Sequence, residues 1–533
     1  MVRTFLNLVA AGVLALGGSL WAADSATPAA SPTAAAATAA PTVEDRLAAL
    51  EKQLMPTTVI KKDGDKEIVF SNGSDGLTVG EKAERAWQSL GQYEMNPGDN
   101  AWMLVAAALV LLMTLPGLAL FYGGLVRSKN VLGTMMQCIS IAGIISALWL
   151  ICGYSLAFSG DGKFIGNFDW LFLNGVLWDA GKSTIMMAPN ATYAMSIPHG
   201  TFMLFQMMFA IITPALICGA YAERIKFSGM VVFSVLWFFV VYIPMAHMVW
   251  GNGGMLNWWA DQNGEDGYGM ASFDFAGGTV VHISSGVAAL VLAIVLGRRK
   301  VADTEPMRPH NLTLSFIGAC LLWVGWFGFN AGSALCASGL ATLAFANTQI
   351  AAAAAAIAWP IAEWIIRGKP TVLGAISGAV AGLVAITPAA GFVSPTSALI
   401  IGLVAGVLCF VGCSYLKAAL KYDDALDAFG VHGIGGIWGA MATGIFFQVD
   451  ANPGVQFLNA GLADAIRKGT HSYGTIIFNQ LEAVAITVVF SAVATLIIAL
   501  VVKYTVGLRV TADDEAEGLD VSQHGEEGYH KLT

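Results

Sequence analysis

DFAGGTVVHISSGVAALV, residues 274–291, is the stretch that decides the fold of this chain. It has the composition of a membrane helix, yet His282 lies well inside the apolar run. Ionisable residues are costly inside a bilayer, so such a residue predicts function. A second stretch, DALDAFGVHGIGGIWGAM, repeats the arrangement, because Asp424 precedes His432 by the interval that separates Asp274 from His282. The match predicts an internal repeat with a site shared between its halves.

A single buried histidine is more often a packed, hydrogen-bonded core residue than a mechanistic one. Two histidines at matched positions in an apolar chain favour the functional interpretation, because an idle polar group there is penalised by desolvation. Asp424 and Asp427 are the acidic residues that accompany the second histidine.

Composition places the chain in a membrane. Of its 533 residues, 56% are hydrophobic and 12% are charged, whereas soluble domains carry about twice that charged fraction. The net charge of -9 comes without a basic patch, so no nucleic-acid partner is predicted. The seven cysteines lie in or beside apolar runs without metal-ligand spacing, so no metal or other cofactor is expected. No nucleophile–base pair is evident, and the chain is not predicted to be an enzyme.

The first part of the chain is predicted to lie outside the cytoplasm of a bacterial cell. Residues 1–23 have the charged start and short apolar core of a signal peptide, with an uncleaved first helix as the alternative. Residues 24–96 are predicted to form an appendage. It comprises an Ala/Thr/Pro-rich linker, a short helix over 42–55, a hairpin over 57–71 around Asp63-Gly64, and a second short helix from Thr78 to Leu90.

The first short helix of the appendage carries an apolar stripe of Val43, Leu47, Leu50 and Leu54. The stripe has heptad spacing. It predicts either a three-stranded bundle near the axis of a trimer or a helix packed on its own hairpin.

Eleven apolar runs of spanning length follow, in a membrane domain over 97–505. We expect an all-α integral membrane protein, with helices near 101–123, 131–158, 201–220, 228–250, 275–297, 313–333, 342–366, 372–389, 396–417, 428–449 and 477–505. From an outer N-terminus, eleven spans place the tail, 506–533, in the cytoplasm. Most lysines and arginines between the runs then fall on the inner side, as the positive-inside rule requires.

Helices one to five and six to ten form two blocks of five. Because five is odd, the second block is inverted relative to the first, and the eleventh helix stands outside the repeat. His282 would enter from the outer side and His432 from the inner side. Each lies about 10–12 Å from its acidic end at about 1.5 Å per residue, so both are expected near the membrane midplane.

Several outer-side residues join the histidines. Phe209 lies part-way along the third predicted helix, Trp250 ends the fourth, and Phe329 and Ser333 end the sixth. An interfacial tryptophan is usually only an anchor. Together these residues are expected to form an aromatic vestibule that attracts a small cation by its ring faces.

The motifs LPGLALFYGGLVRSKN, GAYAERIKF, AHMVWG, DFAGGTVVHI, WFGFNAGSA and DAFGVHGIGGIWGA, with the tail GLRVTADDEAEGLDVSQHGEEGYH, resemble the ammonium transporter family (Amt/MEP/Rh), bacterial Amt branch. The resemblance covers residue 97 to the C-terminus. It implies a recruitment site of Phe209, Trp250 and Ser333, a gate of Phe209 and Phe329, and a pore with twin histidines.

By the same resemblance Asp274 is a structural acid, the protein is a homotrimer in the inner membrane, and a P-II-type signalling protein binds its cytoplasmic face. The appendage and a long loop over 159–200 depart from the family pattern. We expect capture of ammonium, loss of a proton, and passage of ammonia along the histidines, with methylammonium as an analogue. The alternatives are an uncoupled gas or solute channel and an ammonium sensor; the short tail, with no output domain, argues against the sensor.

Overall fold

The computed structural model describes most of the chain from residue 95 onward. The described residues are 62–63, 66–67, 95–179, 184–185, 189–190, 192–259, 272–300, 307–458, 460–468 and 472–529. The chain divides into two compact units, Met1–Gln92 and Tyr93–Thr533.

In the first unit, strand β1 (Lys62–Asp63) pairs antiparallel with β2 (Lys66–Glu67). This pair lies inside the hairpin predicted over 57–71. The signal peptide, the apolar stripe and the second short helix of the appendage fall outside the residues that the structure describes.

The second unit is helical, and its order follows the eleven predicted runs. Its first five runs are α4 (Pro97–Leu112), η2 (Met113–Leu118) and α5 (Ala119–Leu125); η3 (Ser128–Asn130), α6 (Val131–Leu148), η4 (Trp149–Gly153) and α7 (Tyr154–Phe158); α8 (His199–Tyr221); α9 (Phe227–Trp237), η6 (Phe238–Tyr242) and α10 (Ile243–Trp250); and η7 (Gly278–Ile283) and α11 (Ser284–Leu296).

The later runs are α12 (Leu312–Gly332); α13 (Gly339–Arg367); α14 (Val372–Ile386); α15 (Pro395–Val411), η9 (Gly412–Leu416) and α16 (Lys417–Leu420); η10 (Phe429–Gly433) and α17 (Ile434–Phe446); and α20 (Tyr473–Thr505). Within the described residues, ten of these helical runs are long and apolar enough to cross a membrane. The shorter apolar helix α14 lies where the eighth membrane helix was predicted. The protein is a multi-pass membrane protein.

Side-chain caps set several helix starts. The Asn96 side chain accepts from the amides of Gly98 and Asp99 at the start of α4, and Thr371 accepts from the Gly374 amide at the start of α14. Such caps pair backbone donors that a helix leaves free. They explain why α4 begins at Pro97 rather than at the predicted residue 101.

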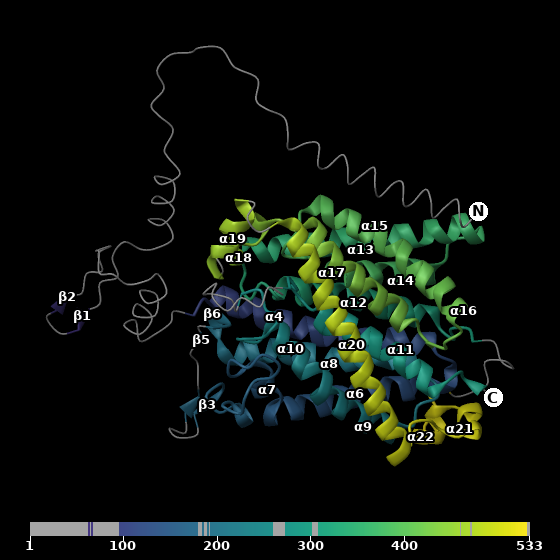
Figure 1. Cartoon of the computed structure of the whole chain (residues 1–533). Helices are drawn as coiled ribbons and strands as arrows, with labels where there is room; N and C mark the ends of the chain where they lie inside the picture. Colours follow the sequence, from purple (N-terminus) through teal and green to yellow (C-terminus); the bar gives the residue numbers. More distant parts are fainter. Residues whose placement is uncertain are drawn as a thin grey trace, which may run out of the picture. The chain divides into compact units, whose positions relative to one another are not determined.

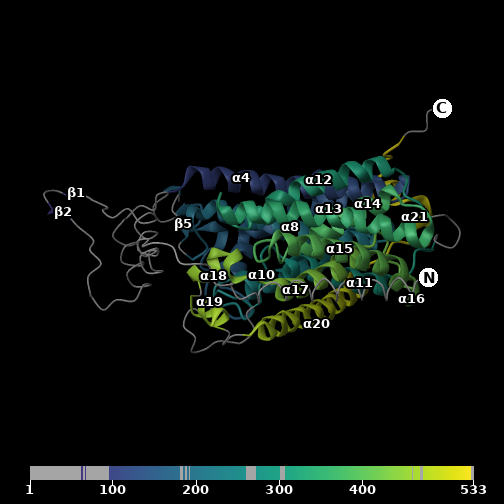
Figure 2. The same cartoon turned by 90° about the horizontal axis from the view of Figure 1, so that it is seen from above.

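The helices of this unit run roughly alongside one another, and α20 crosses obliquely over them (Figure 1). One end of the bundle, here the strand face, carries β5 (Pro189–Asn190), β6 (Ala194–Pro198), α18 (Pro453–Leu458) and α19 (Ala460–Arg467). The opposite end, the tail face, carries α21 (Ala512–Glu517) and α22 (Leu519–His524), and Figure 2 shows the same separation from above. A further short antiparallel pair, β3 (Trp178–Asp179) and β4 (Thr184–Ile185), lies in the predicted long loop.

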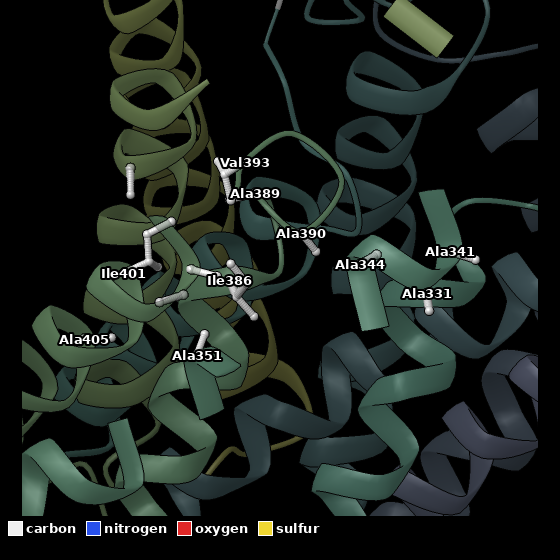
Figure 3. Close-up of a cluster of buried hydrophobic side chains, with 13 residues drawn as sticks. Ala331, Ala341, Ala344, Ala351, Ile386, Ala389, Ala390, Val393, Ile401 and Ala405 are labelled. Atoms are coloured by element: carbon white, nitrogen blue, oxygen red, sulfur yellow. The ribbon is translucent and has the colours of Figure 1, made fainter. Parts of the chain in front are cut away.

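The second repeat is packed largely through small side chains. Figure 3 shows Ala351 of α13, Ile386 of α14 and Ala405 of α15 in one buried cluster. Close approach through small residues is the usual way that helices associate in membranes, where lipid supplies no hydrophobic drive.

Buried ion pairs join the loops at the tail face. Glu223 accepts from Arg127 Nε at 3.2 Å and from Arg299 Nη1 at 3.1 Å, and Arg299 Nη2 lies 2.9 Å from Asp423 Oδ1. Burial alone would raise the pKa of Asp423, but the charge and hydrogen bonds of Arg299, together with Arg224, hold it at about 2. Several of the basic residues predicted for the inner side therefore gather at one end of the bundle and are paired there.

Candidate functional site

The two matched histidines meet in the centre of the fold. Nδ1 of His432 lies 3.3 Å from Nδ1 of His282, and the rings are nearly parallel with centroids 5.3 Å apart. A hydrogen bond between these atoms requires one ring to carry its proton on Nδ1 while the other accepts there. Both side chains are buried, and His282 Nε2 has no hydrogen-bond partner among the described residues.

Each histidine stands in a π-helical turn at the start of its helix. His282 belongs to η7 and His432 to η10, and α11 packs on η10 while α17 packs on η7. The crossing brings the starts of both helices together, so the internal repeat predicted from the two sequence stretches has a shared centre.

Asp274 builds the start of the first histidine helix. Its carboxylate accepts from the amides of Gly277, Gly278 and Thr279 at 2.7 Å each, and also from the Thr279 hydroxyl. Gly277 has a φ of 113°, which an L side chain rarely adopts. A carboxylate that already accepts four hydrogen bonds acts as a structural cap.

Asp424 has the corresponding place before His432. Its Oδ2 accepts from the Phe429 amide at 2.7 Å, whereas Oδ1 is buried without a partner among the described residues. Burial raises the pKa of Asp424 to about 6, although Lys417 opposes the rise. Asp427 instead pairs with Lys417 Nζ at 2.7 Å, so the two acids of the second repeat have different surroundings.

Two stacked aromatic rings lie next to the first histidine. Phe209 of α8 stacks on Phe329 of α12 with centroids 4.2 Å apart, and both are fully buried. The ring of Phe329 lies 6.0 Å from that of His282. Phe209 and Phe329, which were predicted as a gate, are therefore in contact with each other, and Phe329 lies beside His282.

A cavity of about 210 Å³ lies against Phe209 of the aromatic pair. Trp250 stands edge-on to Phe209 with centroids 5.7 Å apart, and its Nε1 donates to the Asp274 carbonyl at 3.1 Å. The Ser333 hydroxyl donates to the Phe329 carbonyl at 2.9 Å, which leaves its lone pairs for another donor. Phe209, Trp250, Asp274 and Ser333 all line this cavity, which we call the vestibule.

Two further aromatic residues of the site were not predicted from the sequence. Trp326 stacks on His282 at 5.4 Å between centroids and donates to Thr387 Oγ1 at 2.9 Å. Phe205 packs on Phe209 at 4.9 Å. Each lies three or four residues before a predicted gate residue, on the same face of its helix. That spacing was a signal that could have identified both.

Comparison with known proteins decides the family. The model of the ammonium transporter family matches residues 101–529. The chain belongs to the ammonium transporter family. It is 50% identical over 435 residues to an ammonium transporter of Bacillus subtilis, a match that covers 82% of this chain and 99% of that one. An ammonium transporter of Aquifex aeolicus is 45% identical over 442 residues and matches 82% of this chain and 94% of its own length.

Solved structures of this family share the fold. The crystal structure of Saccharomyces cerevisiae Mep2 is 34% identical, with a TM-score of 0.69, and covers 83% of this chain and 93% of its own. A protein described as a sensor Amt protein is 29% identical with a TM-score of 0.67, and covers 80% of this chain and 98% of its own. The family match over residues 101–529 lies within the second unit, Tyr93–Thr533.

Proposed function

We propose that this protein carries ammonium across a bacterial cytoplasmic membrane by separating it into ammonia and a proton. The observation that supports this most is the unbroken series from the vestibule to the stacked Phe209–Phe329 pair and on to the two histidines. The strand face would be outside and the tail face cytoplasmic, which agrees with the basic residues paired at the tail face.

Recruitment would take place in the vestibule. Ammonium is strongly hydrated, and a buried full charge is costly without compensation. The ring faces of Trp250 and Phe209 offer cation–π attraction, and the lone pairs of Ser333 accept from an N–H group. Asp274 would hold the surrounding backbone in place, because its oxygens already accept four hydrogen bonds.

Passage would use the neutral molecule. The stacked rings and the buried histidines offer no counter-charge, whereas ammonia crosses an apolar route cheaply. The His282–His432 pair supplies one donor and one acceptor, through which a proton can be relayed between the rings. Potassium has no proton to lose, so this scheme rejects it.

The assembly and partners are also proposals. We propose a homotrimer, with each chain carrying its own pore, and a P-II-type signalling protein as a cytoplasmic partner of the tail. A transporter role is favoured over an enzyme or a sensor, because the curated relatives named above are described as ammonium transporters.

Charge movement in proteoliposomes tests the proposal. A jump in ammonium concentration should give a transient current that saturates with ammonium, whereas an equal potassium jump should give none. Ammonia flux without current would favour the uncoupled channel, and the absence of any ammonium-dependent flux would refute transport altogether.

A further inference from the structure

Gln206 is a polar residue of the vestibule without a role in the proposed transport steps. It lies on α8, three residues before Phe209 and therefore one turn nearer the mouth, and its side chain lines the vestibule. The residue is 9% exposed. Its Oε1 atom is buried and accepts no hydrogen bond from any residue that the structure describes.

Several other polar groups of the vestibule already have hydrogen-bond partners. Both oxygens of Asp274 accept backbone hydrogen bonds. The Tyr193 hydroxyl donates to the Phe158 carbonyl at 2.5 Å and accepts from the Asn252 amide at 3.0 Å. Asn452 Oδ1 accepts from the Gly454 amide at 2.9 Å. Gln206 is different, because the residue lines the cavity while its acceptor oxygen is buried without a donor among the described residues.

We infer that Gln206 is a second hydrogen-bond acceptor for the ammonium ion in the vestibule, in addition to Ser333. This inference rests on the proposed function. A buried acceptor without a donor is unfavourable, and a cation that arrives with N–H groups removes that penalty. The affinity of the vestibule for ammonium therefore includes the free energy recovered at Gln206.

The chemistry of the ion fits this role. Ammonium presents four N–H donors in a tetrahedron, and ring faces compensate its charge without accepting every one of them. The glutamine amide turns about its last side-chain torsion with a broad, roughly two-fold preference, so its oxygen can be directed at the ion with little change in shape. Methylammonium keeps three N–H groups, enough for both Ser333 and Gln206, and should depend on Gln206 in the same way.

Variants at this position separate binding from packing. Gln206→Leu keeps the approximate volume and removes the acceptor, so the half-saturating ammonium concentration should rise about tenfold, equivalent to about 1.4 kcal/mol, while the maximal current stays within about twofold. Gln206→Glu keeps an acceptor and adds negative charge, so half-saturation should equal or fall below that of the unmodified protein. If Gln206 had only a structural role, Gln206→Glu would damage transport more than Gln206→Leu, because it buries a carboxylate.

Gln137 provides the matched control. It is 3% exposed on α6, its Oε1 also has no partner among the described residues, and it does not line the vestibule. Gln137→Leu should leave half-saturation unchanged. Should Gln206→Leu fail to assemble, Gln206→Met has a similar shape without an oxygen and carries the same expectation.

The measurement is ammonium-dependent current in proteoliposomes that contain the full chain. Higher half-saturation for Gln206→Leu together with rescue by Gln206→Glu supports the inference. Half-saturation equal to that of the unmodified protein in Gln206→Leu, or an increase in Gln206→Glu as large as in Gln206→Leu, overturns it. Failure of the unmodified protein to respond to ammonium would instead refute the proposed function, so the two failures are distinguishable.

Discussion

Gly286 of α11 lies directly against Gly433, the residue that follows His432. A Cβ atom at Gly286 would come within 2.5 Å of Gly433 Cα and would overlap its amide nitrogen. The two helices therefore approach through their backbones at the level of the histidines. This contact sets the separation at which the two imidazole rings meet.

We predict that Gly286→Ala disrupts the histidine pair. The added methyl group must displace one helix, and overpacking of this kind costs about 1–3 kcal/mol. Thermal unfolding in detergent should shift downward, and ammonium current should be lost or strongly reduced. Gly143→Ala is the control, because nothing lies within 4 Å of a Cβ there; an equal effect of both substitutions would contradict the role given to the Gly286 contact.

Trp250→Leu should weaken recruitment. Cation–π attraction contributes about 0.5–2 kcal/mol, so the half-saturating ammonium concentration should rise between about twofold and about thirtyfold. Trp250→Phe keeps a ring but loses the hydrogen bond to the Asp274 carbonyl, and should give a smaller rise. Trp364→Leu, at a side chain that is 62% exposed on α13, should leave half-saturation unchanged. Concentration curves that coincide for Trp250→Leu and the unmodified protein would count against this role.

The tail-face ion pairs predict a pH-dependent stability. The folded pKa of Asp423, about 2, lies below the ordinary value of about 3.9. Ionised Asp423 therefore stabilises the fold above the unfolded pKa, and this contribution is lost as pH falls through about 2. Its size near neutral pH is about 2 kcal/mol, with about half remaining at pH 3.

Asp423→Asn should accordingly lower the unfolding temperature at pH 7 more than at pH 3. The matched change is Asp450→Asn, in a pair with Arg467 whose side chains are 78% and 40% exposed. Exposed pairs contribute roughly 0–1 kcal/mol, so this variant should have little effect. A shift for Asp423→Asn that does not vary with pH would be inconsistent with the assigned ionisation.

The tail is predicted to be needed for partner binding or gating. Glu515 is fully buried, accepting from Arg509 Nη2 at 2.7 Å and from the Lys300 amide at 2.5 Å, and Asp520 Oδ1 accepts from the Gly133 amide at 2.7 Å. Deletion from Thr511 onward removes these contacts, whereas truncation after Tyr529 keeps them. Transport and binding of a P-II-type protein should change only in the longer deletion; intact transport and binding there would exclude this role.

Much of the membrane domain could be predicted from the sequence, because helix length, apolar composition and basic loops are all local properties. The twin histidines could also be placed from their positions on the predicted helices, whereas the pairing of Phe209 with Phe329 was implied only by the family resemblance. The π-helical turns that hold His282 and His432 could not, because a 3.6-residue pattern carries no sign of one extra residue in a turn. The predicted fifth helix began at 275, whereas η7 starts at Gly278 because Asp274 takes the first amides.

Long-range contacts could not be predicted from the sequence. The spacing of Trp326 from Phe329 could place it on the same helix face but carried no sign of its stack on His282. Nothing local to Gln206 indicated a buried oxygen without a donor. The eighth helix was predicted over 372–389 but ends at Ile386. The Phe275 amide donates to the Pro388 carbonyl beyond that end, a contact between the two repeats that the sequence of either one alone does not specify.

The most direct test of the account is ion discrimination by the histidine pair. Ammonium and potassium currents are measured in the same proteoliposomes for the unmodified protein, His282→Ala and His432→Ala. We predict ammonium current without potassium current in the unmodified protein. Both variants should lose this discrimination, because a pore without the imidazole pair no longer relays the proton separately from ammonia. Unchanged ammonium current together with unchanged rejection of potassium in both variants would contradict it.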